Sequence, residues 1–399
     1  MQLALPGNPH LTYCTNIHAG ETWSEIASSL ERFLPAIKNE ISPSHPMGVG
    51  LRLSAVAADE LAAPATLDAF RAFLFDHDLY VFTVNAFPYG PFHGSPVKER
   101  VYEPDWRTSE RLLFTTKVAD ILAALAPANV ECSISTVPGA FRSYVKTPAD
   151  VARIRSAMVA CAAHLFNLHQ NSGHSIVLAI EPEPACFLET TEEAIDFIQR
   201  ELFGPSAVST FAKLTNTSSS EAEAGLRHHI GLCFDVCHSA VAFENAKEAL
   251  AAIESAGIRV AKVQLSAALQ IACTGVEIEP LLAAFDDGVY LHQTVHSRGR
   301  DLCRYTDLAD AFASLRNGEK GGDWRVHCHV PVFLDRFDGL QSTQATLREV
   351  LGLCRERPVS PHLEVETYTW SVLPPSLRHG DLAGDIVREL KWVRSELGA

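Results

Sequence analysis

The sequence predicts an α/β fold of the TIM (β/α)8 barrel type. Strand-like and helix-like segments alternate almost throughout the chain, which is the pattern of βαβ units in a parallel sheet. Eight such units occur, and several of the strand-like segments end on polar side chains, where barrels carry their active sites. No G-x-G-x-x-G motif follows a strand, so a closed barrel is favoured over a doubly wound nucleotide-binding sheet.

Short apolar runs mark the expected strands. The eight barrel strands are expected at residues 11–17, 47–54, 79–86, 129–136, 175–182, 230–236, 259–266 and 361–367, and a ninth strand at 324–330. Amphipathic segments predict helices at about residues 66–76, 108–126, 149–170, 245–256, 307–316 and 343–356. Two helix starts have the spacing of a capping box, Thr22 with Glu25 and Thr190 with Glu193.

Two stretches interrupt this alternation. We expect one domain, residues 1–399, with inserted loops after the fifth and seventh strands, at about 205–229 and 267–323. Residues 290–298 are too polar for a core strand and too aromatic for a disordered linker, so they are expected to close over the C-terminal mouth of the barrel. His296 or Arg298 would then reach inward. A peripheral decoration or an oligomer contact is the alternative.

Composition narrows the range of partners. The chain has 48 acidic and 33 basic residues and a net charge of −15, which disfavours nucleic acid and anionic membrane surfaces. Ten scattered cysteines without a C-x-x-C pair indicate reduced, buried thiols. The N-terminal residues do not form a signal peptide, and no apolar run is long enough to span a bilayer. We expect a cytoplasmic protein with a small-molecule ligand.

Carboxylates at strand ends are the candidate metal ligands. Glu181 ends the fifth expected strand, Asp235 the sixth and Glu366 the last, with Glu364 as the alternative on the same strand face. Gln264, near the end of the seventh strand, would be a weak ligand for a hard cation. A divalent metal (Mn, Zn, Mg or Fe) would offset the cost of burying these carboxylates. Ion pairs at the barrel rim are the alternative for each of them.

Histidines near these strand ends add nitrogen ligands. His238 follows Asp235 by three residues, and the two are the strongest signal in the chain. His327 and His329 lie at i and i+2, on one side of an extended segment, and could chelate a metal. A hydrogen-bonded loop explains the latter pair equally well.

Further polar and aromatic side chains at the expected barrel mouth are candidates for substrate binding. The loop after the third strand combines prolines, glycines and aromatics, as loops that wall a pocket do. The candidates are His18, Asn85, His93, Lys98, Trp106, Lys262 and His296.

The strand-end pattern resembles the xylose isomerase-like TIM barrels, a group that includes sugar isomerases, ketose 3-epimerases and endonuclease IV. The resemblance implies metal ligands at Glu181, Asp235, Gln264 and Glu366, with Gln in place of the epimerase His, and a substrate-facing His238. It further implies proton transfer next to a carbonyl, with Glu181 and Glu366 exchanging protons and His238 stabilising the developing charge. For an endonuclease IV-like enzyme, His238, His327 and His329 would hold an additional zinc, but the fourth strand ends without a histidine.

Three motifs resemble the metabolite-traffic protein EboE family more narrowly. They are residues 11–18, the loop 85–94 with Lys98 and Trp106, and residues 363–370. The resemblance implies a sugar-phosphate isomerase-like barrel that acts on or holds a small polyol or secondary-metabolite precursor, together with other proteins of one operon. A non-catalytic metabolite-binding scaffold is the main alternative, which Gln264 favours, and endonuclease IV-like DNA repair is a remoter one.

Overall fold

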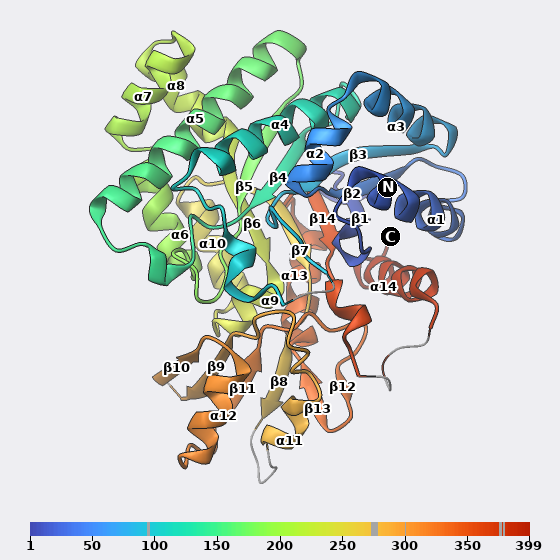
Figure 1. Cartoon of the computed structure of the whole chain (residues 1–399), viewed down its shortest axis with the longest axis vertical. Coiled ribbons are helices and arrows are strands. Elements are labelled where there is room, and N and C mark those ends of the chain that lie inside the picture. Colours follow the sequence, from blue (N-terminus) through green and yellow to red (C-terminus); the bar gives the residue numbers. More distant parts are fainter. Residues whose placement is uncertain (94–95, 273–277, 300, 375–376, 378–379) are drawn as a thin grey trace.

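The computed structural model describes residues 1–93, 96–272, 278–299, 301–374, 377 and 380–399. Eight strands form one parallel sheet in the order β1-β14-β7-β6-β5-β4-β3-β2, surrounded by helices (Figure 1). The strands are β1 His10–Tyr13, β2 Met47–Arg52, β3 Leu79–Asn85, β4 Cys132–Thr136, β5 Ile176–Ile180, β6 Ile230–Asp235, β7 Val260–Leu265 and β14 His362–Val365. All eight predicted barrel strands are present, and the predicted fold class is confirmed.

Side chains help to close the barrel between its first and second strands. A single bridge pairs Cys14 with Gly50, and it is the only backbone pairing recorded there among the described residues. Thr12 Oγ1 donates to Gly48 O (2.8 Å) and accepts from the Gly50 amide (3.1 Å). The Thr12 hydroxyl therefore replaces some of the backbone hydrogen bonds that are absent between β1 and β2. The buried carbonyl of Gly48 and the amide of Gly50 both keep a hydrogen-bond partner.

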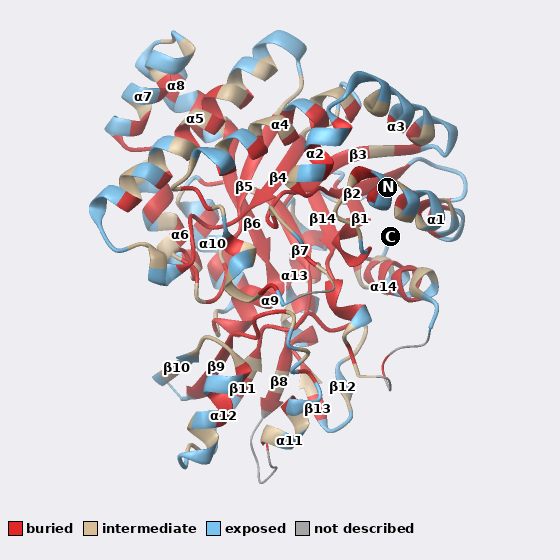
Figure 2. Cartoon of the chain, in the orientation of Figure 1, coloured by how far each residue is buried: buried red, intermediate tan, exposed pale blue. Residues whose placement is uncertain are grey.

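Helices alternate with the strands and cover the barrel from outside (Figure 2). Their buried faces pack against the sheet, and their outer faces are exposed. The helices are α1 Trp23–Ile41, α2 Ala55–Leu61, α3 Pro64–Asp76, α4 Ser109–Leu125, α5 Pro148–Ser172, α6 Thr191–Phe197, α7 Pro205–Thr215, α8 Ser219–His229, α9 Val236–Val241, α10 Ala246–Ser255, α13 Gln344–Glu356 and α14 Leu382–Leu397, with α11 Ile278–Ala283 and α12 Leu308–Arg316 in the second insertion.

Local capping explains where several of these helices begin. Thr22 and Glu25 form a complete capping box at α1, as do Thr190 and Glu193 at α6. Each box satisfies amides that a helix start leaves without partners. The first insertion, 205–229, consists of α7 and α8. No described helix has the length and apolar composition that crossing a bilayer requires.

The second insertion is a six-stranded antiparallel sheet, larger than the predicted 267–323. Its order is β10-β9-β11-β8-β13-β12, and it lies below the barrel in Figure 1. Its strands are β8 Leu269–Ala272, β9 Thr294–Arg298, β10 Asp301–Tyr305, β11 Asp323–Val326, β12 Arg336–Phe337 and β13 Leu340–Ser342. The predicted ninth strand belongs here and ends at Val326 rather than at residue 330.

Residues 290–298 were expected to close over the barrel mouth with His296 or Arg298 reaching inward, and the structure agrees with this only in part. Most of β9 is buried, although its sequence is polar, because its polar groups find partners: His296 Nε2 bonds Gly321 O (2.8 Å) and its ring stacks on Trp324. His296 therefore lies inside the inserted sheet and does not reach the barrel, and Arg298 pairs with Glu319. Tyr290 and Leu291, by contrast, line a cavity at the barrel mouth.

A buried ion pair fills the barrel interior. Lys262 Nζ lies 2.5 Å from Glu364 Oε2, and neither side chain has any exposed surface. Gly50 leaves room for this pair, because a Cβ atom there would overlap the Glu364 carboxylate and lie 2.7 Å from Tyr13 O. The absence of a side chain at Gly50 is therefore a packing requirement.

We expect Gly50→Ala to destabilise the protein by about 3 kcal/mol or more, because it displaces one partner of a buried ion pair. Urea unfolding followed by circular dichroism measures the change. Gly352→Ala is the matched control, since its Cβ would meet only Arg355 Nη2 at 3.7 Å inside α13. That control should be neutral or stabilising by about 1 kcal/mol. Equal stability of both variants would contradict the packing requirement.

Candidate metal centre

A cavity opens where the C-terminal ends of the barrel strands meet the inserted sheet. The empty space inside it, counted together with the open solvent at its mouth, is about 540 Å³. Carboxylates and imidazoles form its polar side: Glu181, Glu183, His238, His327, His329 and Glu366. They come from the loop after β5, from α9, from the segment after β11 and from the end of β14.

Three strand ends bring three carboxylates together. Glu181 follows β5, Asp235 ends β6 and Glu366 follows β14, and one oxygen of each lies within 4.8 Å of the others. All three are at least 95% buried. Glu181 Oε2 and Asp235 Oδ2 have no hydrogen-bond partner among the described residues. Buried carboxylate oxygens of this kind require a cation or a proton.

The local fold aims one oxygen of Asp235 at this cluster. Asp235 is the N-cap of α9, and its Oδ1 accepts from the His238 amide (2.9 Å) and from Ser266 Oγ (2.8 Å). Those two bonds fix the carboxylate plane, so Oδ2 is left free to bind a ligand.

Two asparagines hold Glu366 in the same way. Asn16 Nδ2 and Asn85 Nδ2 donate to Glu366 Oε1 at 2.8 and 2.9 Å. Glu364, the alternative ligand on the same strand, instead pairs with Lys262 in the barrel interior. The geometry therefore favours Glu366 over Glu364 as the metal-binding carboxylate.

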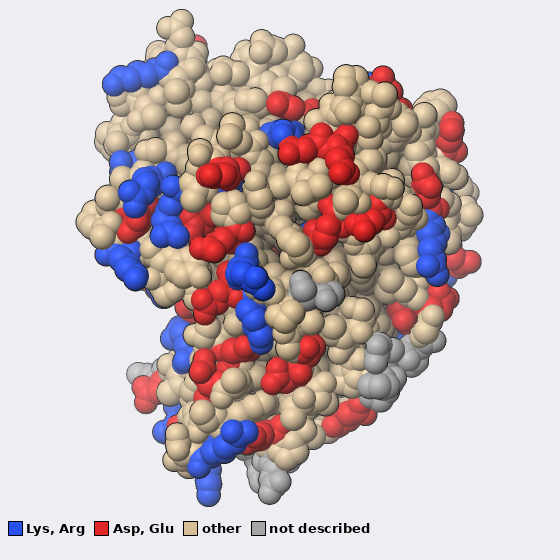
Figure 3. All heavy atoms as spheres, viewed as in Figure 1, with Lys and Arg blue, Asp and Glu red and all other residues tan. Residues whose placement is uncertain are grey.

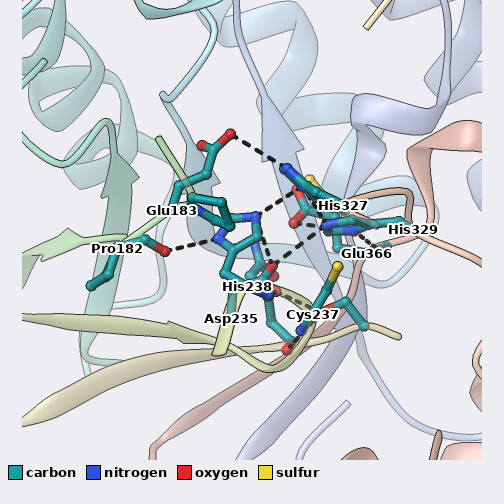
Figure 4. A network of polar contacts seen from close by, with 12 residues as sticks. Pro182, Glu183, Asp235, Cys237, His238, His327, His329 and Glu366 are labelled. Carbon is teal, nitrogen blue, oxygen red and sulfur yellow. Dashed lines mark hydrogen bonds and ion pairs between the residues drawn. The ribbon is translucent and has the colours of Figure 1, made fainter. Parts of the chain in front are cut away.

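Three imidazoles converge beside the carboxylates (Figure 4). His238 Nε2 lies 3.1 Å from His327 Nε2, which lies 3.3 Å from His329 Nε2. Asp235 Oδ2 lies 3.9 Å from the Nε2 atoms of His238 and His329. Nitrogen ligands of a tetrahedral zinc, each about 2.0–2.1 Å from the metal, stand about 3.3 Å apart.

The hydrogen bond that each ring makes through Nδ1 determines whether its Nε2 atom carries a proton or a lone pair. His238 Nδ1 lies 2.9 Å from Pro182 O, and His329 Nδ1 lies 2.7 Å from Glu366 O. A carbonyl oxygen only accepts, so both Nδ1 atoms carry the proton and both Nε2 atoms carry a lone pair in the neutral ring. His327 Nδ1 likewise lies 2.7 Å from Gln293 Oε1.

Neutral rings in these tautomers would point three lone pairs at one another. One added proton on His238 could relieve a single contact, and Asp235, Glu183 and Glu181 do raise the pKa of His238 against the opposing effect of burial. Burial lowers the pKa of His327 well below its usual range and that of His329 to about 4. A divalent cation would satisfy all three nitrogens at once, and the donor set therefore fits a metal.

The carboxylates show the same need for positive charge. Burial, with a contribution from Asp235, raises the pKa of Glu181 to about 8. Burial and the neighbouring Glu181 and Asp235 raise the pKa of Glu366 well above its usual range. Asp235 keeps a lowered pKa despite its burial, because His238 and His329 lie close. Without a cation, burial and the neighbouring carboxylates therefore favour the protonated forms of Glu181 and Glu366.

The predicted metal ligands therefore divide into two adjacent positions that share Asp235. Glu181, Asp235 and Glu366 form a carboxylate position, and Asp235, His238 and His329 form a histidine position. His327 lies beside the histidine position, with its Nε2 atom 3.1 Å from His238 Nε2 and 3.3 Å from His329 Nε2. Gln264 faces Asp235 and Glu364 in the strand register, and its amide nitrogen and oxygen have no partner among the described residues. The inserted segment also brings an imidazole to two of the carboxylates: His329 lies 3.9 Å from Asp235 Oδ2 through Nε2 and 4.0 Å from Glu366 Oε2 through Nδ1.

Of the seven predicted substrate-binding residues, Asn85 and Lys98 line the cavity. The structure does not bring the other five to its wall. His18 bonds Tyr13 OH and stacks on Phe33, and His93 packs edge-on against Phe92. Trp106 is fully buried and donates to Thr136 Oγ1, Lys262 pairs with Glu364, and His296 lies in the inserted sheet.

Several residues of the centre were not predicted. Gln293 accepts from His327 through Oε1, and its Nε2 donates to Tyr102 OH (2.7 Å) and Pro184 O (3.1 Å). Tyr102 OH in turn donates to Glu183 Oε1 (2.5 Å). Cys237 places a thiol within reach of His327 and His329. Cys237 and Glu183 could have been found from the sequence, because each lies two residues after a predicted ligand, Asp235 or Glu181. No neighbouring sequence feature indicated that Gln293 contacts His327.

Comparison with solved structures finds similar barrels at low identity. They include a crystal structure of IOLI protein with a binding zinc atom (13% identity, 98% of each chain, TM-score 0.48). A xylose isomerase-like TIM barrel protein from Mycobacterium smegmatis in complex with magnesium is 11% identical (99% of this chain, 97% of that chain, TM-score 0.48). D-psicose 3-epimerase with D-tagatose from Clostridium cellulolyticum H10 is 12% identical (98% and 99%, TM-score 0.48). The sequence matches no protein-family model and no curated protein.

We expect Gln293→Leu to weaken zinc binding by about 10–100-fold, because His327 loses the acceptor that fixes its tautomer. Competition with a zinc-sensitive chelator dye measures the affinity. Gln199→Leu, at an exposed position far from the centre, is the matched control and should leave zinc affinity unchanged. Unchanged affinity in Gln293→Leu would show that His327 is not a ligand.

Metal binding should release protons and tighten with rising pH. Glu181, with a pKa of about 8, has to lose its proton before it can bind a cation. Affinity should therefore rise roughly tenfold per pH unit for each proton released, between pH 6 and 8. Manganese titrations at several pH values, in wild type and Glu181→Gln, measure the slope. A slope that is the same in both proteins would contradict the assignment of that proton to Glu181.

Proposed function

We propose that the protein is a divalent-metal enzyme of the isomerase or epimerase type that acts on a small polar metabolite. The observation that supports this most strongly is the group of three buried carboxylates, Glu181, Asp235 and Glu366, beside a cavity at the barrel mouth. Glu181 and Glu366 belong to different strand ends, so they can face a bound ligand from two directions. Two carboxyl groups placed in this way can remove and return a proton at one carbon.

The chain's own residues supply the remaining parts of such a reaction. A divalent metal in the carboxylate position would polarise a carbonyl and a neighbouring hydroxyl oxygen. Glu181 and Glu366 take and give the proton at carbon. Asn16 and Asn85 hold Glu366 in place through its Oε1, which keeps Oε2 for the ligand or its proton. His238 lines the cavity, and when its Nε2 atom carries a proton instead of a metal it can donate to an oxygen that gains charge.

The motifs that resemble the EboE family support a metabolite-handling role. Asn16 lies in motif 11–18, Asn85 in loop 85–94 and Glu366 in motif 363–370, and both asparagines donate a hydrogen bond to Glu366 Oε1. The resemblance therefore falls on residues that build the centre. We propose that the ligand is a polyol or secondary-metabolite precursor, handled together with other proteins of one operon. Gly94, the last residue of the loop motif, lies outside the described residues.

Hydrolysis of a phosphoester is the second candidate. Two adjacent metal positions that share Asp235 favour it, because paired metals commonly activate both oxygens of such a displacement. The charge distribution opposes a nucleic-acid substrate: on the face shown in Figure 3, Lys and Arg are interspersed with Asp and Glu and form no extended basic surface. An abasic duplex incubated at low salt with zinc-loaded protein should therefore remain uncut, and cleavage would favour the endonuclease IV-like alternative.

Solvent exchange tests the proposed proton transfer. Manganese-loaded protein in D₂O should exchange the α-protons of hydroxyacetone, a small α-hydroxyketone, as followed by NMR. Glu181→Gln and Glu366→Gln should each slow this exchange by about 100-fold or more. The exposed Glu40→Gln is the matched control and should exchange at the wild-type rate.

Two results would count against catalysis. Equal exchange in wild type and both variants would refute the roles of Glu181 and Glu366. Metal-loaded wild type that exchanges no more than buffer would favour the non-catalytic, metabolite-binding barrel instead.

A further inference from the structure

The cavity at the metal centre has two chemically different sides. Its polar side carries the carboxylates and imidazoles described above. The remaining lining includes an apolar and aromatic surface, with contributions from Phe87, Phe92, Val101, Tyr290, Leu291 and Tyr368. A ligand that filled only the polar side would leave this second surface against water.

Three rings dominate the apolar side. Phe92, Tyr290 and Tyr368 pack with centroids 5.1–5.3 Å apart, and all three line the cavity. They come from the loop after β3, the inserted sheet and the segment after β14. Part of this packing holds the insertion on the barrel, but the ring surfaces that face the cavity are available to a ligand. Aromatic surfaces of this kind bind flat or aliphatic groups.

The cavity offers little to an anion. Lys98 is the only Lys or Arg among its described lining residues, and its Nζ lies 2.5 Å from Asp307 Oδ2. The polar side already gathers four carboxylates, Glu181, Glu183, Asp235 and Glu366, of which three line the cavity. Apart from the metal positions, which the oxygens at the other end of the ligand would occupy, a phosphate or carboxylate would therefore find no free counter-charge among the described lining residues. Sites for such groups are commonly built from Arg, Lys or amide nests.

We propose that the ligand is an uncharged hydroxycarbonyl or polyol compound that carries an apolar substituent, and that it is not a sugar phosphate. Its oxygens lie toward the metal-binding residues, and its substituent lies against Phe92, Tyr290 and Tyr368. This inference rests on the proposed function, because it uses the same centre to bind the polar end of the ligand.

Three α-hydroxyketones that share one metal-binding end can test the proposal. Hydroxyacetone carries a methyl group, 2-hydroxyacetophenone a phenyl group and dihydroxyacetone phosphate a phosphate. Isothermal titration of metal-loaded protein, freed of excess metal, compares their affinities. The phenyl compound should bind at least about tenfold more tightly than the methyl compound, since a buried ring contributes more than that factor requires. The phosphate should bind no better than the methyl compound.

Variants locate the preference on the aromatic side. Phe92→Leu and Tyr290→Leu keep an apolar side chain and should weaken binding of the phenyl compound several-fold more than they weaken binding of hydroxyacetone. Manganese affinity is measured on each variant first, because the same rings also hold the insertion on the barrel. Phe75→Leu, at a position where the ring is 85% exposed on α3, is the matched control and should keep the preference.

Each contrary outcome overturns the proposal. Equal affinity for the phenyl and methyl compounds, tighter binding of the phosphate, or no binding of any of the three would do so. Metal titration without ligand separates this failure from that of the proposed function: protein that takes up manganese but lacks the phenyl preference refutes only the ligand class. Protein that takes up no metal refutes both.

Discussion

The convergence of buried lone pairs at one point is the constraint on which the site depends. Three imidazole Nε2 atoms and oxygens of three carboxylates meet between the barrel and the inserted sheet. Glu181 Oε2 and Asp235 Oδ2 have no hydrogen-bond partner among the described residues. Backbone carbonyls of Pro182 and Glu366 force two of the rings to present lone pairs, so the arrangement is repulsive unless a cation or several protons occupy it. Burial excludes the water that would otherwise weaken this repulsion.

The barrel and the second insertion each contribute different side chains to this centre. The barrel delivers carboxylates from strand ends, where the parallel sheet brings them together. The insertion delivers His327 and His329 from the segment after β11, and Gln293, just before β9, fixes one of them. Docking of the insertion, through the Lys98–Asp307 pair and the ring cluster, is therefore coupled to completion of the site.

Sequence reasoning found the barrel and its carboxylates because both have local signals. Apolar runs ending on Glu181, Asp235 and Glu366 mark strand ends, and capping boxes mark helix starts. The sequence could not show that His329 approaches Asp235 and Glu366, because that contact depends on how a six-stranded insertion docks on the barrel. The sequence also could not show which residues at the barrel rim face the cavity. His18 lies after β1 and Trp106 in the loop after β3, but the His18 ring stacks on Phe33 and the Trp106 indole donates to Thr136. His296 is a polar side chain, but its hydrogen-bond partner, Gly321 O, lies within the insertion.

X-ray diffraction with anomalous scattering tests the central claim most directly. Crystals of protein purified without chelator and supplied with zinc should be measured on both sides of the zinc absorption edge. The account predicts an anomalous peak about 2.0–2.1 Å from the Nε2 atoms of His238, His327 and His329, near Asp235 Oδ2. Absence of a peak, with the three imidazoles still within hydrogen-bonding distance of one another, would contradict the account.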